Sequence, residues 1–258
     1  MAERRRSIPS PVADDNYFVR SQQPLHSLML LLPFILAYEV GTFRYAGAMG
    51  GRQLAARTWV QQFLELFGAA GDYLPGLAVV VVLLAMHLSQ RRKWRLRPGL
   101  YVAMACESLA LALPLLLFGL LTGSGHATAA FAGPGGAENR PVFDSLQQGV
   151  LLSLGAGIYE ELVFRLVLIA AVHFIIVDLL GMPPRRGAVA AILVSSCLFA
   201  MAHFNRSNPF TSPAFAFYAI AGFYFAMIYL LRGFGIVAAT HAFYDVMVVA
   251  WGMSHEHR

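Results

Sequence analysis

Seven apolar segments constrain this chain more than any other feature of its sequence. A helix needs about 20 apolar residues to cross the hydrocarbon core of a bilayer. Only 13% of the residues are charged and 58% are hydrophobic, whereas soluble domains are about 25% charged. The sequence therefore predicts an all-α, polytopic membrane protein that folds as a single bundle. The apolar segments are Leu25–Phe43, Leu74–Ser89, Leu100–Leu121, Leu146–Leu180, Ala188–Phe204, Pro213–Leu231 and Gly235–Trp251.

The connections between these segments indicate how the chain is oriented. Arginine and lysine concentrate in the N-terminal tail, in 91–97, in 181–187 and at Arg232. With seven spans all four positions fall on one side of the membrane, and such an excess marks the cytoplasmic side. We therefore expect a cytoplasmic N-terminus. The short, arginine-rich chain is of a bacterial kind, so we place it in the bacterial inner (cell) membrane.

Two stretches leave the number and position of helices open. The segment Leu146–Leu180 is too long for one upright span, so it is either one long tilted helix or two helices broken near Gly155 and Gly157. The total is accordingly seven or eight transmembrane helices. The stretch Thr58–Ala70 is predicted to be an amphipathic helix at the membrane interface. Because the arginines lie in connections and not on one polar face, we expect no nucleic-acid partner.

Ionisable residues inside the apolar segments point to a site. Charge at bilayer depth costs about 2.5–3.5 kcal/mol per residue even on lenient scales. Glu161 and Arg165 are four residues apart, in the favourable order for an ion pair along a helix. Glu160 points about 100° away from Glu161 and has no partner nearby in sequence. Such a carboxylate suits a general base that takes a proton from water.

Two further pairs have helical spacing. Phe199 and His203 are four residues apart in one segment, and His241 and Asp245 are four apart in another. Two histidines and one or two carboxylates from three helices could converge on one water molecule or on a metal such as zinc. The alternative is structural, because a single histidine in a span commonly makes interhelical hydrogen bonds. Glu39, alone in the first span, is expected to pair with an arginine or to line a cavity.

The three patterns together resemble the CPBP family (CAAX protease and bacteriocin-processing, also called Abi) of intramembrane endopeptidases, which is related to the type II CAAX prenyl endopeptidase. The family pattern is Glu-Glu-x-x-x-Arg, then Phe-x-x-x-His, then His-x-x-x-Asn or Asp, and all three motifs occur here in that order. This chain has no His-Glu-x-x-His helix of the zincin type. The motifs read Glu160-Glu161-Leu-Val-Phe-Arg165, Phe199-Ala-Met-Ala-His203 and His241-Ala-Phe-Tyr-Asp245.

The resemblance implies a role for each residue. Glu160 would activate the hydrolytic water with help from His203. His241 and Asp245 would hold the oxyanion of the tetrahedral intermediate, Asp245 either in its protonated form or by orienting His241. Glu161, Arg165 and Phe199 would support these groups. No cofactor is favoured; zinc is the alternative, with Glu160, His203 and His241 as its ligands.

The resemblance also implies a function and a division of the chain. We expect an intramembrane endopeptidase that hydrolyses a peptide bond of a membrane-associated protein or peptide, in contact with the lipid bilayer. Two other functions stay open from the residues alone: a proton-coupled transporter and a non-catalytic membrane scaffold that uses the same buried cluster. The predicted parts are a polar cytoplasmic tail at 1–24, helices and loops without catalytic motifs at 25–145, a catalytic transmembrane core at 146–251 and a C-terminal tail at 252–258.

Overall fold

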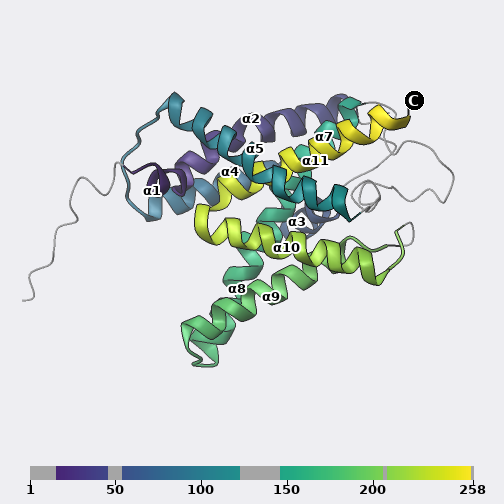
Figure 1. Cartoon of the computed structure of the whole chain (residues 1–258). Helices are drawn as coiled ribbons and strands as arrows, with labels where there is room; N and C mark the ends of the chain where they lie inside the picture. The colour runs from purple at the N-terminus through teal and green to yellow at the C-terminus, as the bar shows by residue number, and fades with distance from the viewer. Residues whose placement is uncertain (1–15, 46–53, 123–145, 206–207, 257–258) are drawn as a thin grey trace, which may run out of the picture.

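The computed structural model describes residues 16–45, 54–122, 146–205 and 208–256, and the regular secondary structure of these residues is all helical (Figure 1). Six of its helical segments are long and apolar enough to cross a membrane, and α4 is a shorter apolar helix. The predicted all-α, polytopic membrane fold is confirmed. The helices that correspond to the predicted spans are α2 (Pro24–Arg44), α4 (Leu74–Ser89), α5 (Pro98–Leu121), α7 (Leu146–Glu161) with its continuation, α9 (Pro184–Ala202), α10 (Ser212–Arg232) and α11 (Phe234–Glu256).

Proline and glycine set many of the helix ends. Proline stands in the first turn of α2, α4, α5, α9 and α10, where its missing N–H costs no hydrogen bond. The turn between α10 and α11 is a single residue, Gly233, with φ of 81°. Glycine reaches this conformation without steric cost, so the chain can reverse direction at once and pack α11 beside α10.

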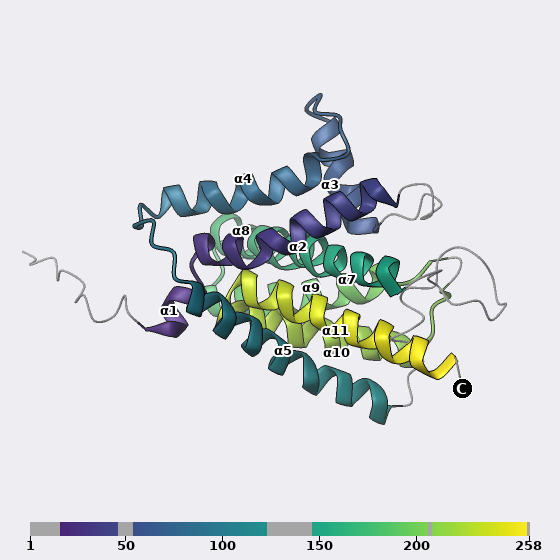
Figure 2. The same cartoon turned by 90° about the horizontal axis from the view of Figure 1, so that it is seen from above.

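Helix α11 occupies the centre of the bundle. In its apolar window 72% of residues are buried, against 22–50% for the other candidate spans, and it packs against α2, α5, α7 and α10. Seen from above, α4, α2, α11 and α5 follow one another across the molecule (Figure 2). Figure 1 shows α1 and the α4–α5 connection at one end of the bundle and the C-terminus at the other.

The long fourth segment is one continuous helical stretch and is not broken at its glycines. The α-helix α7 passes into a π-helical turn, η2 (Leu162–Val167), then into α8 (Leu168–Phe174) and a second π-helical turn, η3 (Ile175–Leu179). The change in helix type begins directly after Glu161. Helical π segments are frequent at functional sites, and here one carries the arginine of the first motif.

The glycine at position 157 permits close packing between α7 and α11. A Cβ atom at Gly157 would lie 2.5 Å from the carbonyl oxygen of Ala238 and 2.7 Å from the backbone nitrogen of Ala242. Since both contacts are with backbone, the helices could not yield by a side-chain rotation. Small residues at such crossings let membrane helices approach closely, and this crossing lies one turn before Glu160 and includes Ala242 of the third motif.

We expect Gly157→Ala to push α7 away from α11 and to destabilise the protein by about 1–3 kcal/mol through overpacking. Unfolding of the purified protein in detergent would measure this change. Gly99→Ala is the matched control, because a Cβ at Gly99 meets nothing within 4 Å. Equal stability of the two variants would contradict the packing role of Gly157.

The structure differs in detail from three predictions: those for the two ends of the chain and for the helix at the membrane interface. The polar N-terminal tail contains a short helix, α1 (Tyr17–Ser21), which is anchored by tertiary contacts. The interfacial helix expected at Thr58–Ala70 is α3 (Ala55–Glu65) and ends one turn earlier. Helix α11 continues beyond Trp251 into the expected C-terminal tail. The tail before residue 16 lies outside the described residues.

Candidate active site

The first and second motifs meet where α7 and α9 end. Glu160 is the penultimate residue of α7, and His203 is the residue that caps α9. Nε2 of His203 lies 3.8 Å from Oε2 of Glu160. This separation is longer than a direct hydrogen bond, so the two groups could share a water molecule. Oε2 of Glu160 is buried and has no hydrogen-bond partner among the described residues.

The ring of His203 is held in place from several directions. Its Nδ1 lies 2.8 Å from the carbonyl oxygen of Phe199, which can only accept, so Nδ1 carries the proton. In the neutral ring Nε2 is then an acceptor, and it is Nε2 that faces Glu160. The ring also stacks on Tyr218, with centroids 4.4 Å apart and planes 22° apart. The side chain of Asn208 donates a 2.8 Å hydrogen bond to the carbonyl oxygen of His203.

The first and third motifs meet through a chain of ionic groups. Nδ1 of His241 lies 2.8 Å from Oε1 of Glu161, and its Nε2 lies 3.4 Å from Oδ2 of Asp245. A carboxylate thus faces each ring nitrogen, an arrangement that an imidazolium satisfies by donating both N–H groups. All three side chains are buried. The position of Asp245 fits an orienting contact to His241.

Arg165 closes this chain on the far side of Glu161. Its Nε lies 3.1 Å from Oε2 of Glu161, and neither side chain is exposed. The guanidinium lies over the ring of Phe199, 4.5 Å from its centroid, and its Nη1 donates a 3.4 Å hydrogen bond to the hydroxyl of Ser195. The ring of Phe199 thus contacts both Arg165 and His203, whose ring centroid is 4.6 Å away.

The structure thus brings together every residue named from the three motifs. The η2 turn contacts both α9 and α11, and this places the first motif between the other two. The backbone is irregular at this point, because η2 is π-helical and His203 lies beyond the last turn of α9.

Several residues of the site were not predicted. Tyr218 and Phe225 stack on His203 and His241 respectively, the latter with centroids 4.6 Å apart. Their spacing of seven on α10 places them on one helix face, which is the only signal that the sequence contains for them. Ser195 and Asn208 carry no signal, because they act through contacts that only the fold creates: Ser195 accepts from Arg165 and donates to the carbonyl oxygen of Phe164, and Asn208 donates to that of His203.

The described residues include no group of three histidine, cysteine, aspartate or glutamate side chains placed to hold a metal ion. Of the alternative zinc ligands, Glu160 and His203 face each other, while the ring nitrogens of His241 face Glu161 and Asp245. Glu39 lies elsewhere: it accepts a hydrogen bond from Tyr159, and its Oε2 is 3.8 Å from Nη2 of Arg57. The expected pairing of Glu39 with an arginine is therefore present.

Comparison with known proteins finds one protein family that the region carrying the motifs resembles. Residues 142–247 match the family model described as type II CAAX prenyl endopeptidase Rce1-like. No curated protein and no solved structure matched the chain. The matched region contains all three motifs, so the resemblance inferred from them is confirmed. With its apolar helices, this chain is an integral membrane protein, and its residues 142–247 are similar to the type II CAAX prenyl endopeptidase Rce1-like family.

Proposed function

We propose that the protein is an intramembrane endopeptidase that hydrolyses a peptide bond of a membrane-associated protein or peptide, with a water molecule activated by Glu160. The family match supports a CAAX-type membrane protease. The observation that carries the finer proposal is the buried, unpartnered Oε2 of Glu160 opposite Nε2 of His203. Two acceptors at this separation suit one water molecule that donates a hydrogen bond to each.

The chemistry follows from that placement. With both O–H groups directed at acceptors, the water presents a lone pair to the scissile carbonyl carbon. Glu160 accepts one proton as the C–O bond forms, and the carbonyl oxygen becomes an oxyanion. When the tetrahedral intermediate collapses, the C–N bond breaks and Glu160 returns its proton to the departing amine. The carboxylate ends the cycle in its starting form.

His241 supplies positive charge for the oxyanion in this proposal. Glu161 and Asp245 hold its ring between them, and Phe225 covers one ring face. A fixed positive charge in a site that excludes water stabilises developing negative charge without reorganisation. Asp245 acts by orienting His241, and the Glu161–Arg165 pair fixes the far side of the same ring.

Asp245→Ala and Asp245→Asn test the orienting role. The asparagine oxygen can still accept from Nε2 of His241, so Asp245→Asn is expected to retain most of the activity. Asp245→Ala removes the acceptor and is expected to lower kcat by about tenfold to a hundredfold. Initial rates with a cleaved peptide would measure both. An alanine variant as active as the wild type would exclude the role.

The experiment that tests the function uses purified full-length protein and a library of membrane-anchored peptides, prenylated peptides ending in a CAAX box among them. We expect cleavage that persists in a strong chelator. If the chelator abolishes cleavage and zinc restores it, the mechanism is metal-dependent and Glu160 does not activate the water alone. Proton-linked flux in liposomes without cleavage would instead identify a transporter. Absence of both activities would leave the scaffold function.

A further inference from the structure

Tyr244 lies inside the third motif, directly before Asp245, and carries a buried hydroxyl group. The residue is 7% exposed, and its hydroxyl oxygen has no hydrogen-bond partner among the described residues. A buried polar group that gives up water without gaining a new partner costs free energy. Such groups are rare in folded proteins, and a catalytic role is one reason for keeping them. A substrate group could complete the hydrogen bonding of this hydroxyl.

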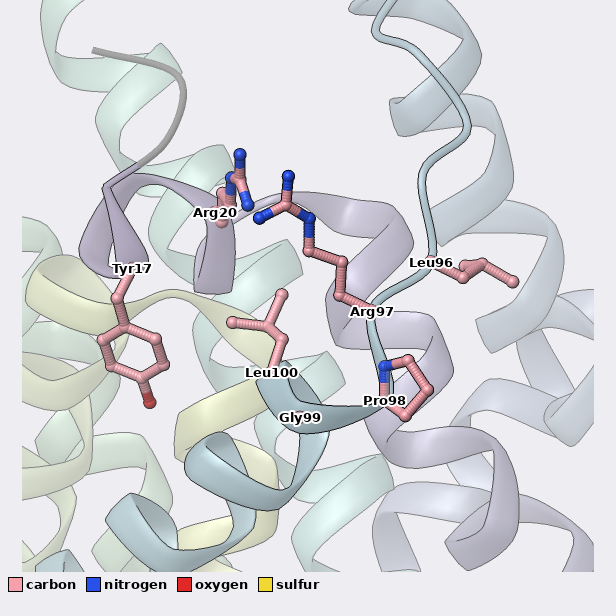
Figure 3. Close-up of a pocket in the computed structure, with 7 residues that line it drawn as sticks. All are labelled: Tyr17, Arg20, Leu96, Arg97, Pro98, Gly99 and Leu100. Carbon is pink, nitrogen blue, oxygen red and sulfur yellow. The ribbon is translucent and has the colours of Figure 1, made fainter. Parts of the chain in front are cut away.

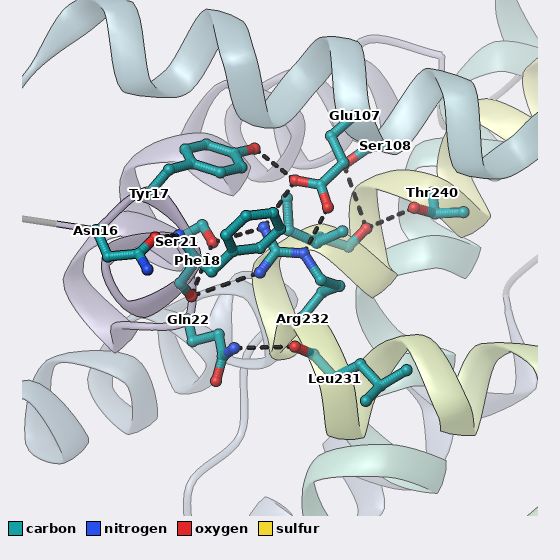
Figure 4. A network of polar contacts seen from close by, with 11 residues as sticks. Asn16, Tyr17, Phe18, Ser21, Gln22, Glu107, Ser108, Leu231, Arg232 and Thr240 are labelled. Atoms are coloured by element: carbon teal, nitrogen blue, oxygen red, sulfur yellow. Dashed lines mark hydrogen bonds and ion pairs between the residues drawn. The ribbon is translucent and has the colours of Figure 1, made fainter.

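Other tyrosine hydroxyls of the protein have partners that give them a structural role. Tyr17 lines a pocket beside α1 (Figure 3), yet its hydroxyl donates to Glu107 and helps to tie α1 to α5 (Figure 4). The hydroxyl of Tyr224 donates a 2.7 Å hydrogen bond to the carbonyl oxygen of Leu111. The Tyr244 hydroxyl differs from these, because no described residue accepts its proton. Removing it should therefore break no hydrogen bond within the described part of the protein.

The ring of Tyr244 is held beside the histidine of the third motif. It meets the ring of Phe225 at a steep angle, with centroids 6.5 Å apart and planes 68° apart. The same Phe225 ring stacks on His241. One aromatic side chain of α10 therefore supports both the phenol of Tyr244 and the imidazole of His241.

The hydroxyl of Tyr244 also lies among the ionisable groups of the candidate active site. It interacts electrostatically with Asp245 and Tyr218. Tyr218 stacks on the histidine of the second motif, and Asp245 interacts electrostatically with Glu160. These contacts place the hydroxyl in the region where the three motifs converge.

The two residues expected to hold the oxyanion use their polar atoms on each other and on Glu161. The ring nitrogens of His241 face Glu161 at 2.8 Å and Asp245 at 3.4 Å, so the imidazolium offers charge while both of its N–H groups are engaged. An ionised Asp245 has no proton to donate, whereas an asparagine at this position would carry an amide N–H group. Acyl transfer relies on donors aimed at the developing charge, and the hydroxyl next to Asp245 is of that kind.

We infer that the hydroxyl of Tyr244 donates a hydrogen bond to the oxyanion of the tetrahedral intermediate, an inference that rests on the proposed peptidase function. A phenol is protonated at neutral pH, and its proton stays on the tyrosine throughout the reaction. The hydrogen bond strengthens as the carbonyl oxygen gains negative charge, because charge-assisted hydrogen bonds are the stronger kind. Tyr244 thus supplies the donor, and His241 supplies the positive charge.

Tyr244→Phe tests this role in purified full-length protein with a cleaved peptide. We expect kcat to fall about a hundredfold, the usual effect of removing one oxyanion donor, and KM to change little, since the charge develops only in the transition state. A phosphonate analogue of the same peptide, which is tetrahedral and negatively charged, should inhibit about a hundredfold more weakly. Unfolding in detergent should match the wild type.

Tyr224→Phe is the matched control, because it also removes one tyrosine hydroxyl from α10 or α11 but one with a structural partner. This control should lose some stability through its broken hydrogen bond to Leu111 and keep both kcat and the inhibition by the phosphonate. The two phenylalanine variants are therefore expected to show opposite patterns, with activity lost in one and stability lost in the other.

Cleavage that is lost in Glu160→Gln but kept in full in Tyr244→Phe would overturn the role of Tyr244 and leave the proposed function standing. A Tyr244→Phe protein that does not fold, or that is slower but inhibited as strongly by the phosphonate, would show that the hydroxyl is structural and would also overturn the role. Absence of cleavage by the wild type would overturn the proposed function and the role of Tyr244 together.

Discussion

Glu160→Gln is expected to reduce peptide cleavage by at least about a hundredfold, because positioned general bases contribute factors of 10² to 10⁴. The amide keeps the size and shape of the carboxylate but cannot take a proton from water. Stability should change little, since Oε2 of Glu160 has no hydrogen-bond partner to lose among the described residues. Rates with a cleaved peptide and unfolding in detergent, measured on the same preparations, would separate the two effects.

Glu39→Gln provides the matched control for this substitution. Glu39 is also a buried carboxylate inside a span, but it contacts Tyr159 and Arg57 and lies outside the motif residues. The control should cleave peptide at a rate close to that of the wild type and lose some stability, because its ion pair to Arg57 is weakened. A Glu160→Gln protein with full activity would rule out the mechanism, whatever the behaviour of the control.

Much of the fold could be predicted because its helices coincide with apolar segments. Leu74–Ser89 is helical over the predicted residues, and the other spans differ from the prediction by a few residues at either end. Hydropathy gives these helices because the bilayer requires every backbone group to be satisfied within a helix. It gives no information on helix type, so the π-helical turn at Leu162–Val167 was not predicted.

The candidate site was predictable only as far as its residues stand in short motifs. Spacing within a helix identified Glu161 with Arg165, and the structure shows that pair. The contact between Glu161 and His241 joins residues 80 positions apart, and no local pattern specifies it. The role of Tyr218 could not be predicted for the same reason, because its stacking on His203 depends on how α10 packs against α9.

Arg165→Met is expected to destabilise the protein by about 3–5 kcal/mol, the usual cost of removing one partner from a buried ion pair. Neither Arg165 nor Glu161 is exposed, so water cannot replace the lost partner. The substitution also removes the cation from the face of Phe199. Unfolding of the purified protein in detergent would measure the change, with Arg186→Met, at an exposed position, as the control for replacing an arginine.

A double-mutant cycle separates the ion pair from simple loss of packing. Because Glu161→Gln removes the charge that Arg165→Met leaves uncompensated, the double variant should lose clearly less stability than the sum of the two single variants. The double variant should nevertheless cleave peptide more slowly than the wild type, because the glutamine at position 161 presents no negative charge to His241. Additive losses would mean that the two side chains stabilise the protein independently. The Glu161–Arg165 pair could then not be the element that fixes the ring of His241.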